Sequence, residues 1–433
     1  MAKRSRLNHL TASHAAGRIA AGMLTSQALV EACLARIAER EGEVHAWAFV
    51  DPELALAQAR DRDRESPRGP LHGVPVGIKD VIDTEDMPTE YGSKLYAGHR
   101  PAMDAATVAR LRAQGAVILG KTRTTEFACP YPTITRNPRD LTRTPGVSSS
   151  GSAAAVADFM VPLANGTQTG GSVIRPASLC GLYGYKGSLD HLDRAGIRHL
   201  KPSIDTLGLF ARSLDDIVLM HAALVNGAST KLKRPRKLRV GVARTHIWPQ
   251  AQAETVAAME RAQTILNAPV VELPSHLEDS MKRFGIVTRY EGMRTTDDMV
   301  KQNLDQINPW SRDGYEAGLK ITYAEFNEAV REAQAARATI ARVFDDYDVL
   351  ITPAATGEAP ADLQLIEGGA FNSLWTHLYV PCVTIPAFEG PNGMPVGLQI
   401  VAAHGADAAL LAAAGWIEAR LKQAAGKLPI GVA

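Results

Sequence analysis

The sequence lacks the features that mark secreted, metal-binding and membrane-spanning proteins. Its four cysteines lie far apart and form no C-x-x-C pair, which predicts neither a zinc site nor a disulfide framework. It contains no run of eighteen apolar residues, so no membrane span is expected. The N-terminal stretch 1–24 is basic, but it has no continuous apolar core before a cleavage site and does not predict a signal peptide. We therefore expect reduced thiols and a cytoplasmic protein.

An excess of charge of either sign is also missing. Lysine and arginine total 47 residues and aspartate and glutamate 46, which gives a net charge of +1. No overall field then attracts nucleic acid or an anionic membrane, and we expect neither as a partner. The basic run 231–239 is the one block of charge in the chain. A solvated connector before a strand is a better interpretation of this run than a docking patch.

Several catalytic signatures are absent as well. The twelve histidines form no H-E-x-x-H motif, no G-x-S-x-G elbow occurs, and no serine lies three residues before a lysine. Gly115 to Thr122 does match the P-loop pattern G-x-x-x-x-G-K-[ST]. However, a helix is expected before Gly115, and the four residues after it are apolar, which is typical of a core strand whose N–H groups bond to neighbouring strands. A helix end followed by a strand is therefore favoured over a nucleotide-binding loop.

Helices and strands alternate along most of the chain. Its 433 residues, 45% of them hydrophobic, are enough for a large buried core. The first seventy residues are expected to be helical, with Ser26 as the N-cap of the first clear helix. Beyond them we expect strands at VPVGIK, DVLITP and PVGLQIVAA, and helices at AATVARLRAQ, 213–225 and 323–344. Such alternation predicts the α/β fold class, with a sheet covered by helices on both faces.

The segment from Thr144 to Ser188 carries the densest chemical signal. Within it, Gly170-Gly171-Ser172 follows a polar stretch and precedes an expected helix. Consecutive glycines allow a sharp turn in which the N–H groups of Thr169 to Ser172 converge, as they would in an oxyanion hole beside a nucleophile. The alternative is that Thr169 or Ser172 only caps the helix.

Two further segments could complete a serine-based site. Lys79 lies in an apolar strand next to Ile78, where it is either an edge residue or a buried base whose pKa is lowered by burial. The run Ser148 to Ser152 precedes a helix of small side chains, and its hydroxyls could bridge catalytic groups or could belong to a flexible loop with an N-cap. Together, the segments suggest a serine hydrolase in which lysine replaces the usual histidine.

In this order and spacing, GIKD, PGVSSSGS and GTQTGGSVIRP closely resemble the motifs of the amidase signature family. The resemblance covers most of the chain, is densest from Gly69 to Ser188, and is closest to the malonamidase type of small amidase. It implies one α/β/α domain at 1–433 around a large mixed sheet. The divisions of this domain would be an N-terminal helical segment (1–68), a catalytic core (69–190) and the rest of the sheet with its covering helices (191–433). It also implies no cofactor, no metal and a homodimer.

The resemblance assigns roles to the residues of the three motifs. It implies a Ser–cis-Ser–Lys triad that cleaves amides through an acyl-enzyme, with Lys79 as the base and Ser172 as the nucleophile. Ser148, preceded by a cis peptide bond, would be the bridging serine. The N–H groups of Thr169 to Ser172 match the oxyanion hole of the family. A neutral, desolvated lysine can accept a proton in such a relay, whereas a charged lysine cannot.

Other positions bear on substrate choice. Arg175 follows Ser172 by one helical turn and resembles the carboxylate clamp of malonamidases, while an ion pair that holds the helix is the alternative. Val147 and Gly187 stand where the family usually has glycine and proline. The irregular stretch Leu189 to Ile204, which includes Lys201, flanks the site in relatives, so the sequence leaves the substrate open.

Three functions are therefore under consideration. The first is a cofactor-free amidase that acts by itself on a small-molecule amide, with or without a carboxylate, and without nucleic acid. The alternative is the amidase component of a tRNA-dependent amidotransferase complex, against which the short length and the near-zero net charge weigh. The third, a nucleotide-hydrolysing protein, depends on Gly115 to Thr122 alone.

Overall fold

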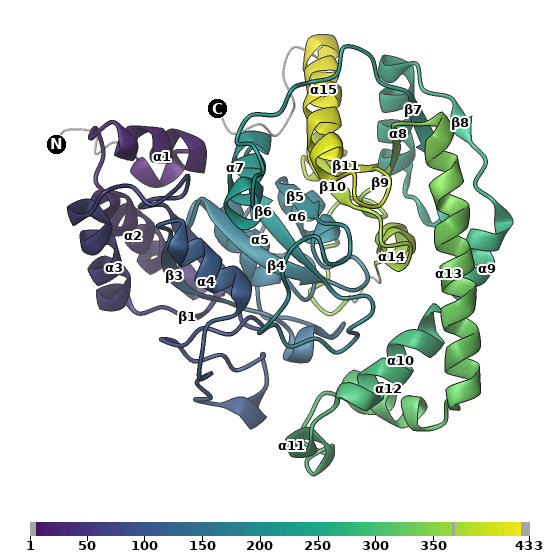
Figure 1. Cartoon of the computed structure of the whole chain (residues 1–433), viewed down its shortest axis with the longest axis horizontal. Coiled ribbons are helices and arrows are strands. Elements are labelled where there is room, and N and C mark those ends of the chain that lie inside the picture. Colours follow the sequence, from purple (N-terminus) through teal and green to yellow (C-terminus); the bar gives the residue numbers. More distant parts are fainter. Residues whose placement is uncertain (1–5, 366–368, 426–433) are drawn as a thin grey trace.

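The chain forms a mixed sheet of eleven strands with helices on both of its faces (Figure 1). It is described by a computed structural model over residues 6–365 and 369–425, so the start of the basic N-terminal stretch and both ends of the predicted domain lie outside the described residues. The strands are β1 (Trp47–Phe49), β2 (Pro75–Lys79), β3 (Val117–Thr122), β4 (Leu163–Gln168), β5 (Tyr183–Lys186), β6 (Thr206–Ala211), β7 (Val240–Ala243), β8 (Val270–Val271), β9 (Val349–Pro353), β10 (Cys382–Glu389) and β11 (Pro395–Val401).

The helices account for most of the remaining chain. They are η1 (Leu7–His9), α1 (Ala12–Ala20), α2 (Ser26–Val44), α3 (Pro52–Arg64), η2 (Lys94–Tyr96), α4 (Ala106–Ala113), η3 (Glu126–Ala128), α5 (Ser150–Ala157), α6 (Ile174–Cys180), α7 (Leu214–Leu224), η4 (Trp248–Gln250), α8 (Ala253–Leu266), α9 (Ser275–Lys282), α10 (Phe284–Thr295), α11 (Asp298–Lys301), α12 (Pro309–Leu319), α13 (Tyr323–Asp346), α14 (Ala370–His377) and α15 (Asp407–Ala425). None of the helices in this described part of the chain is both long enough and apolar enough to cross a membrane.

The order of the strands explains how the signature segments meet. The sheet runs β1-β3-β2-β4-β6-β5-β10-β11-β9-β7-β8. Strand β2 pairs in parallel with both β3 and β4, whereas β4, β6, β5, β10 and β11 form antiparallel pairs. Lys79 at the end of β2 and the turn after β4 therefore lie at the same edge of neighbouring parallel strands. The mixed sheet and the α/β class match the predictions from the sequence.

Alternate residues of the strands feed two separate layers of core. In β4, Leu163 packs into one hydrophobic cluster and Ala164 into another on the opposite face. The first cluster includes residues of α4, α7, α8 and α15, and the second includes residues of α2, α3, α5 and α6. Such alternation follows from the two-residue period of a strand. Because both faces are covered, nearly every strand residue is buried.

One group of helices projects away from the sheet. Helix α13 runs along one side of the molecule, and its N-terminal part carries α10 and α12, with α11 at the far end of the projection (Figure 1). A capping box fixes the start of α13, since the side chains and backbones of Thr322 and Glu325 bond reciprocally. The helix predicted at 323–344 is thus confirmed, and it positions a helical arm beside the loops at the edge of the sheet.

Some local predictions require correction. The expected all-helical N-terminal segment contains a short strand, β1, which pairs with β3. Ser26 is not the N-cap of α2, because the preceding Thr25 accepts the capping bond from the N–H of Ala28. Instead, the hydroxyl of Ser26 donates to the carbonyl of Gly73, 2.8 Å away. A threonine and a serine in succession offer two possible caps, and burial of Ser26 decides between them.

The favoured interpretation of the P-loop-like segment is confirmed. Gly115 has a φ of +83° and ends the stretch that begins with α4, and Val117–Thr122 is the buried strand β3. The amine of Lys121 donates to the carbonyl of Ile82 at 2.7 Å and lies 3.6 Å from a carboxylate oxygen of Asp80. Both the strand backbone and the amine of Lys121 therefore form hydrogen bonds within the protein, and this segment does not form a loop that could bind a phosphate.

Candidate active site

Lys79 lies at the buried end of β2, with no solvent exposure. Its amine donates hydrogen bonds of 2.8 Å to the hydroxyls of Ser148 and Thr167. Burial lowers the pKa of Lys79 to about 7, against the opposing influence of Asp205 and Cys129. Of the two interpretations offered by the sequence, the structure therefore supports the buried lysine with a lowered pKa rather than an edge residue.

Ser148 is 1% exposed and belongs to the turn before α5. The peptide bond between Val147 and Ser148 is trans, as are the other peptide bonds of the described residues, so the expected cis bond is wrong for this structure. The trans form is the ordinary one, because a cis bond before a residue other than proline costs about 3–4 kcal/mol. The positive φ of this turn, 106°, falls on Gly146, which explains how a β-branched residue fits at position 147.

Ser172 lies in the turn between β4 and α6, and its side chain is partly exposed. The turn is held through its carbonyls: Gly170 accepts a bond from the hydroxyl of Thr376, and Gly171 accepts one from the N–H of Arg175. Within residues 6–365 and 369–425, by contrast, the N–H groups of Thr169 to Ser172 have no hydrogen-bond partner. Their assignment to an oxyanion hole stays a prediction.

The alternative interpretation of this turn, a side-chain cap from Thr169 or Ser172, is wrong. No such cap exists at the start of α6. The side-chain oxygen of Gln168 accepts the N–H groups of Val173 and Ile174 instead, at 2.9 and 3.1 Å. Because Gln168 satisfies the helix end, the hydroxyl of Ser172 is left without a structural partner among the residues that the structure describes.

The structure joins the three predicted side chains only in part. Lys79 and Ser148 are directly bonded, whereas no hydrogen bond links Ser148 to Ser172 in the described residues. Arg175 lies in α6 and is buried, at 5% exposure, and its assignment to a carboxylate clamp or a structural ion pair stays a prediction. Gly187, where the family usually has proline, accepts a hydrogen bond at its carbonyl from the amine of Lys186 at 2.7 Å.

Sequence reasoning missed three polar residues around this site. Thr167 and Asn165 lie in β4. The hydroxyl of Thr167 accepts a hydrogen bond from the amine of Lys79, and the side-chain oxygen of Asn165 accepts one from the backbone N–H of Lys79. Asp205 is buried and accepts a hydrogen bond from the hydroxyl of Thr169. Burial raises the pKa of the Asp205 carboxyl, but its bonds to His199 and Thr169 and the charge of Lys201 lower it overall. The polar residues within the buried stretch 165–169 could have indicated Thr167 and Asn165. No sequence pattern indicates Asp205, because its bond to Thr169 joins residues that lie far apart in the chain.

The mixed sheet, the buried lysine–serine bond and the glycine turn beside it are features that an amide or ester hydrolase could use. The profile of the family described as Amidase matches residues 28–411. The chain belongs to the amidase signature family, as the motifs predicted, and is an enzyme that hydrolyses amide C–N bonds.

Individual relatives resemble the chain over nearly its whole length. A glutamyl-tRNA(Gln) amidotransferase subunit from Chloroflexus aggregans is 34% identical over 94% of this chain and 95% of its own. A solved structure of an amidase is 31% identical, with a TM-score of 0.87 over 95% of this chain and 100% of its own. Another solved structure comes from a vestigial protein complex that is described as revealing the evolutionary origins of an s-triazine catabolic enzyme. It is 30% identical to this chain, with a TM-score of 0.87 over 97% of this chain and 100% of its own.

These relatives overturn the prediction about partners. A small-molecule substrate without nucleic acid, in a homodimer, was expected from the near-zero net charge and the resemblance to small amidases. The relatives from Chloroflexus aggregans and Streptomyces coelicolor belong instead to an amidotransferase of glutamyl-tRNA(Gln). Net charge was a poor guide because one component of an assembly can work on tRNA without itself carrying a basic surface.

Proposed function

We propose that this chain is the amide-hydrolysing component of a tRNA-dependent amidotransferase, with Ser172 as its nucleophile. The observation that carries the proposal is the buried bond between Lys79 and Ser148 at the edge of the sheet where the Ser172 turn presents N–H groups that no described residue accepts. The likeness to the glutamyl-tRNA(Gln) amidotransferase relatives supports the role in an assembly. The four free, buried cysteines support action in the cytoplasm.

The chemistry begins with proton transfer along the two serines. Ser172 attacks the carbonyl carbon of the amide, its proton passes to Ser148, and the proton of Ser148 passes to the neutral amine of Lys79. A pKa of about 7 leaves much of this amine neutral at physiological pH. Catalytic hydrogen bonds are often loose without substrate, so the gap between Ser148 and Ser172 is expected to close when the amide binds.

The negative charge that develops on the carbonyl oxygen needs hydrogen-bond donors. We assign this role to the N–H groups of Thr169 to Ser172, since no residue in 6–365 or 369–425 accepts a hydrogen bond from them. Collapse of the intermediate breaks the C–N bond, and Lys79 returns the proton through Ser148 to the departing nitrogen. Water then cleaves the ester on Ser172 and releases the acid. In an amidotransferase, the ammonia set free would be the nitrogen passed to the acyl group on the tRNA.

The test compares the chain by itself with the chain in an assembly. Ammonia release from glutamine, asparagine and simple primary amides is measured for the purified chain, and again after mixing with the other subunits of the Chloroflexus aggregans enzyme. Conversion of glutamyl-tRNA(Gln) is followed in the same mixtures. We expect the assembly to stimulate ammonia release and to convert the tRNA.

Serine variants identify the nucleophile in the same assays. Ser172→Ala should lose roughly four orders of magnitude in kcat, since little catalysis survives the loss of a nucleophile. Ser275→Ala, at an exposed serine at the start of α9, should keep full activity. Rapid amide hydrolysis by the chain alone, with no complex and no tRNA conversion, would contradict the amidotransferase role. Equal activity of Ser172→Ala and the parent chain would contradict the serine mechanism.

A further inference from the structure

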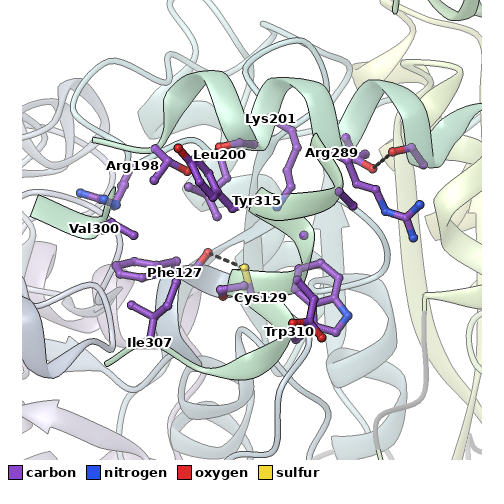
Figure 2. Close-up of a pocket in the computed structure, with 18 residues that line it drawn as sticks. Phe127, Cys129, Arg198, Leu200, Lys201, Arg289, Val300, Ile307, Trp310 and Tyr315 are labelled. Carbon is purple, nitrogen blue, oxygen red and sulfur yellow. Dashed lines mark hydrogen bonds between the residues drawn. The ribbon is translucent and has the colours of Figure 1, made fainter. Parts of the chain in front are cut away.

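A cavity of about 470 Å³ lies outside the chemistry described so far. Its walls come from η3 and the residue after it, from the irregular loop between β5 and β6, and from α10, α11 and α12 (Figure 2). Apolar and aromatic side chains, among them Phe127, Ile307 and Trp310, make up much of the lining. A concave, largely apolar site of this size with a few polar groups is typical of small-molecule binding.

One buried side chain places this cavity beside the reacting groups. Asp205 accepts a hydrogen bond from the hydroxyl of Thr169, and it also accepts the N–H groups of Leu200 and Lys201, each at 3.0 Å. One buried carboxylate thus joins the wall of the cavity to the turn that carries the nucleophile.

Lys201 is the unusual member of the lining. Its residue is only 8% exposed, and its side chain extends into the cavity (Figure 2). Within the described ranges, its amine makes no hydrogen bond and no ion pair, and its one polar contact is the ring of Trp310, with Nζ 5.8 Å from the centroid. The ammonium lies near enough to Asp205 and Glu291 to favour their charged forms, but neither carboxylate forms an ion pair with it, so it can still pair with an anion from outside the chain.

Most of the other charged groups around the cavity are engaged. Arg198 donates to Asp297 at 2.6 Å and lies over three aromatic rings. Glu291 accepts a backbone N–H at 3.1 Å, and Asp313 lies 3.7 Å from Arg312. A ligand carboxylate that enters the cavity would therefore meet two cations, Lys201 and Arg289, whose side chains make no hydrogen bond or ion pair within the described residues.

We propose that Lys201 is a specificity-determining residue that binds a carboxylate on the acyl part of the amide donor. The inference rests on the proposed amide hydrolysis and adds the class of donor, an amide of an acid that carries a second, free carboxylate. In this arrangement the stem between the two groups would lie against Phe127, Ile307 and Trp310. The amide end would point toward the Ser172 turn, which Asp205 connects to the cavity wall.

Matched substrates and variants test this assignment. The substrates are succinamate, glutaramate and adipamate, each with its methyl ester, so that chain length is varied and the charge is removed at constant shape. Lys201→Met keeps the length of the side chain without its charge, Lys201→Arg keeps the charge, and Lys320→Met removes a charge from an exposed position as the control. Ammonia release gives KM and kcat for each pair.

We expect Lys201→Met to raise KM for the preferred acid roughly 10- to 100-fold and to change KM for its ester by less than about twofold. Lys201→Arg should retain most of the preference for the acid, and kcat for the ester should not fall in either variant. Equal losses on acid and ester, or an unchanged preference for the acid in Lys201→Met, would overturn the proposal. The second outcome would assign the carboxylate to another cation such as Arg175.

A binding measurement separates this inference from the proposed reaction. Calorimetry with glutaramate and adipamate on Ser172→Ala, with and without Lys201→Met, reports recognition when no bond is cleaved. Weaker binding to the double variant supports the role of Lys201 even if no ammonia is released in any assay. Identical affinities, or no affinity in either protein, overturn it. Thermal melts check that Lys201→Met is folded, and we expect little loss of stability, because the amine of Lys201 makes no hydrogen bond or ion pair with the described residues.

Discussion

At the scale of single residues, ionisation of Lys79 decides whether the site can work. The amine is fully buried, and its hydrogen bonds to two hydroxyls do not restore the solvation that it has lost. Lysine suits this role because burial can bring its pKa into the physiological range, whereas arginine stays charged. Burial also lowers the pKa of the neighbouring Lys121, to about 8, and the carboxylate of Asp80, 3.6 Å away, opposes this shift.

The activity should depend on pH through this one amine. Its pKa is lowered from 10.5 to about 7, so the amine is neutral above pH 7 and charged below it. Because only the neutral form accepts a proton, kcat/KM for an uncharged amide should rise about tenfold per pH unit below 7 and level off above about pH 8. An uncharged substrate is used so that its own ionisation does not enter the profile.

A variant checks that the profile belongs to Lys79. Lys79→Arg stays charged at every accessible pH, and we expect its kcat to be roughly four orders of magnitude lower over the whole range. A parent profile that is flat between pH 6 and 8, or a Lys79→Arg enzyme with substantial activity, would show that another group is the base.

At the scale of elements, contacts with neighbouring segments, more than bonds within the turn, hold the turn between β4 and α6 in place. Gln168 caps α6 from the preceding strand, and the start of α14 packs closely on the two glycines. Motif spacing in the sequence identified the turn and its serine. It could not identify the packing of Gly369 and Asn372 against them, since these residues lie about two hundred positions further along the chain.

The two glycines of this turn should tolerate a side chain to different degrees. A Cβ at Gly171 would lie 2.3 Å from the side-chain oxygen of Asn372 and 2.9 Å from the Cα of Gly369. For a Cβ at Gly170 the nearest atom is the hydroxyl of Ser373, at 3.3 Å. Gly171→Ala should therefore displace the turn and lower kcat by about a hundredfold, since small misplacements of reacting groups are costly.

Gly170→Ala serves as the matched comparison, with a clearly smaller loss of kcat expected. Both variants are assayed for ammonia release, and their melting temperatures are compared. The loss in Gly171→Ala should fall mainly on kcat, because the cavity that holds the rest of the amide donor is unchanged. Equal kcat values for the two variants would contradict the view that backbone packing against α14 sets the position of Ser172.

Elements were predictable where a long periodic pattern or a cap marked them. The helices at 213–225 and 323–344 and the strands at 349–353 and 395–401 lie close to where the sequence placed them. Strands β6 and β10 were not predicted, because a short apolar run does not reveal its partner or its direction. The helical arm from α10 to α12 was missed for a related reason: its residues are only partly buried, and its amphipathic pattern is weak.

At the scale of the whole molecule, one arginine joins the N-terminal segment to the sheet. Arg212 follows β6 and is 4% exposed. Its guanidinium donates to the carbonyls of Asn8 and Leu10 in the N-terminal segment, at 3.1 and 2.6 Å. It also donates to Val156 and Val161, which flank the link from α5 to β4, at 3.2 and 2.9 Å. Few side chains other than a planar guanidinium could satisfy four carbonyls from two segments.

Loss of Arg212 should therefore loosen the N-terminal segment before the rest of the fold. Arg212→Met leaves these carbonyls without their donor, and an unsatisfied buried group costs about 1–3 kcal/mol. We expect a lower melting temperature and faster amide hydrogen exchange in Leu7–Ala20, with Arg212→Lys intermediate because an ammonium reaches fewer of the carbonyls. Arg18→Met, on the outer part of the same segment, should behave like the parent chain. Uniformly faster exchange across the whole sheet in Arg212→Met would instead mean that the segment and the catalytic core unfold as one unit, and that the signature motifs depend on residues nowhere near them in sequence.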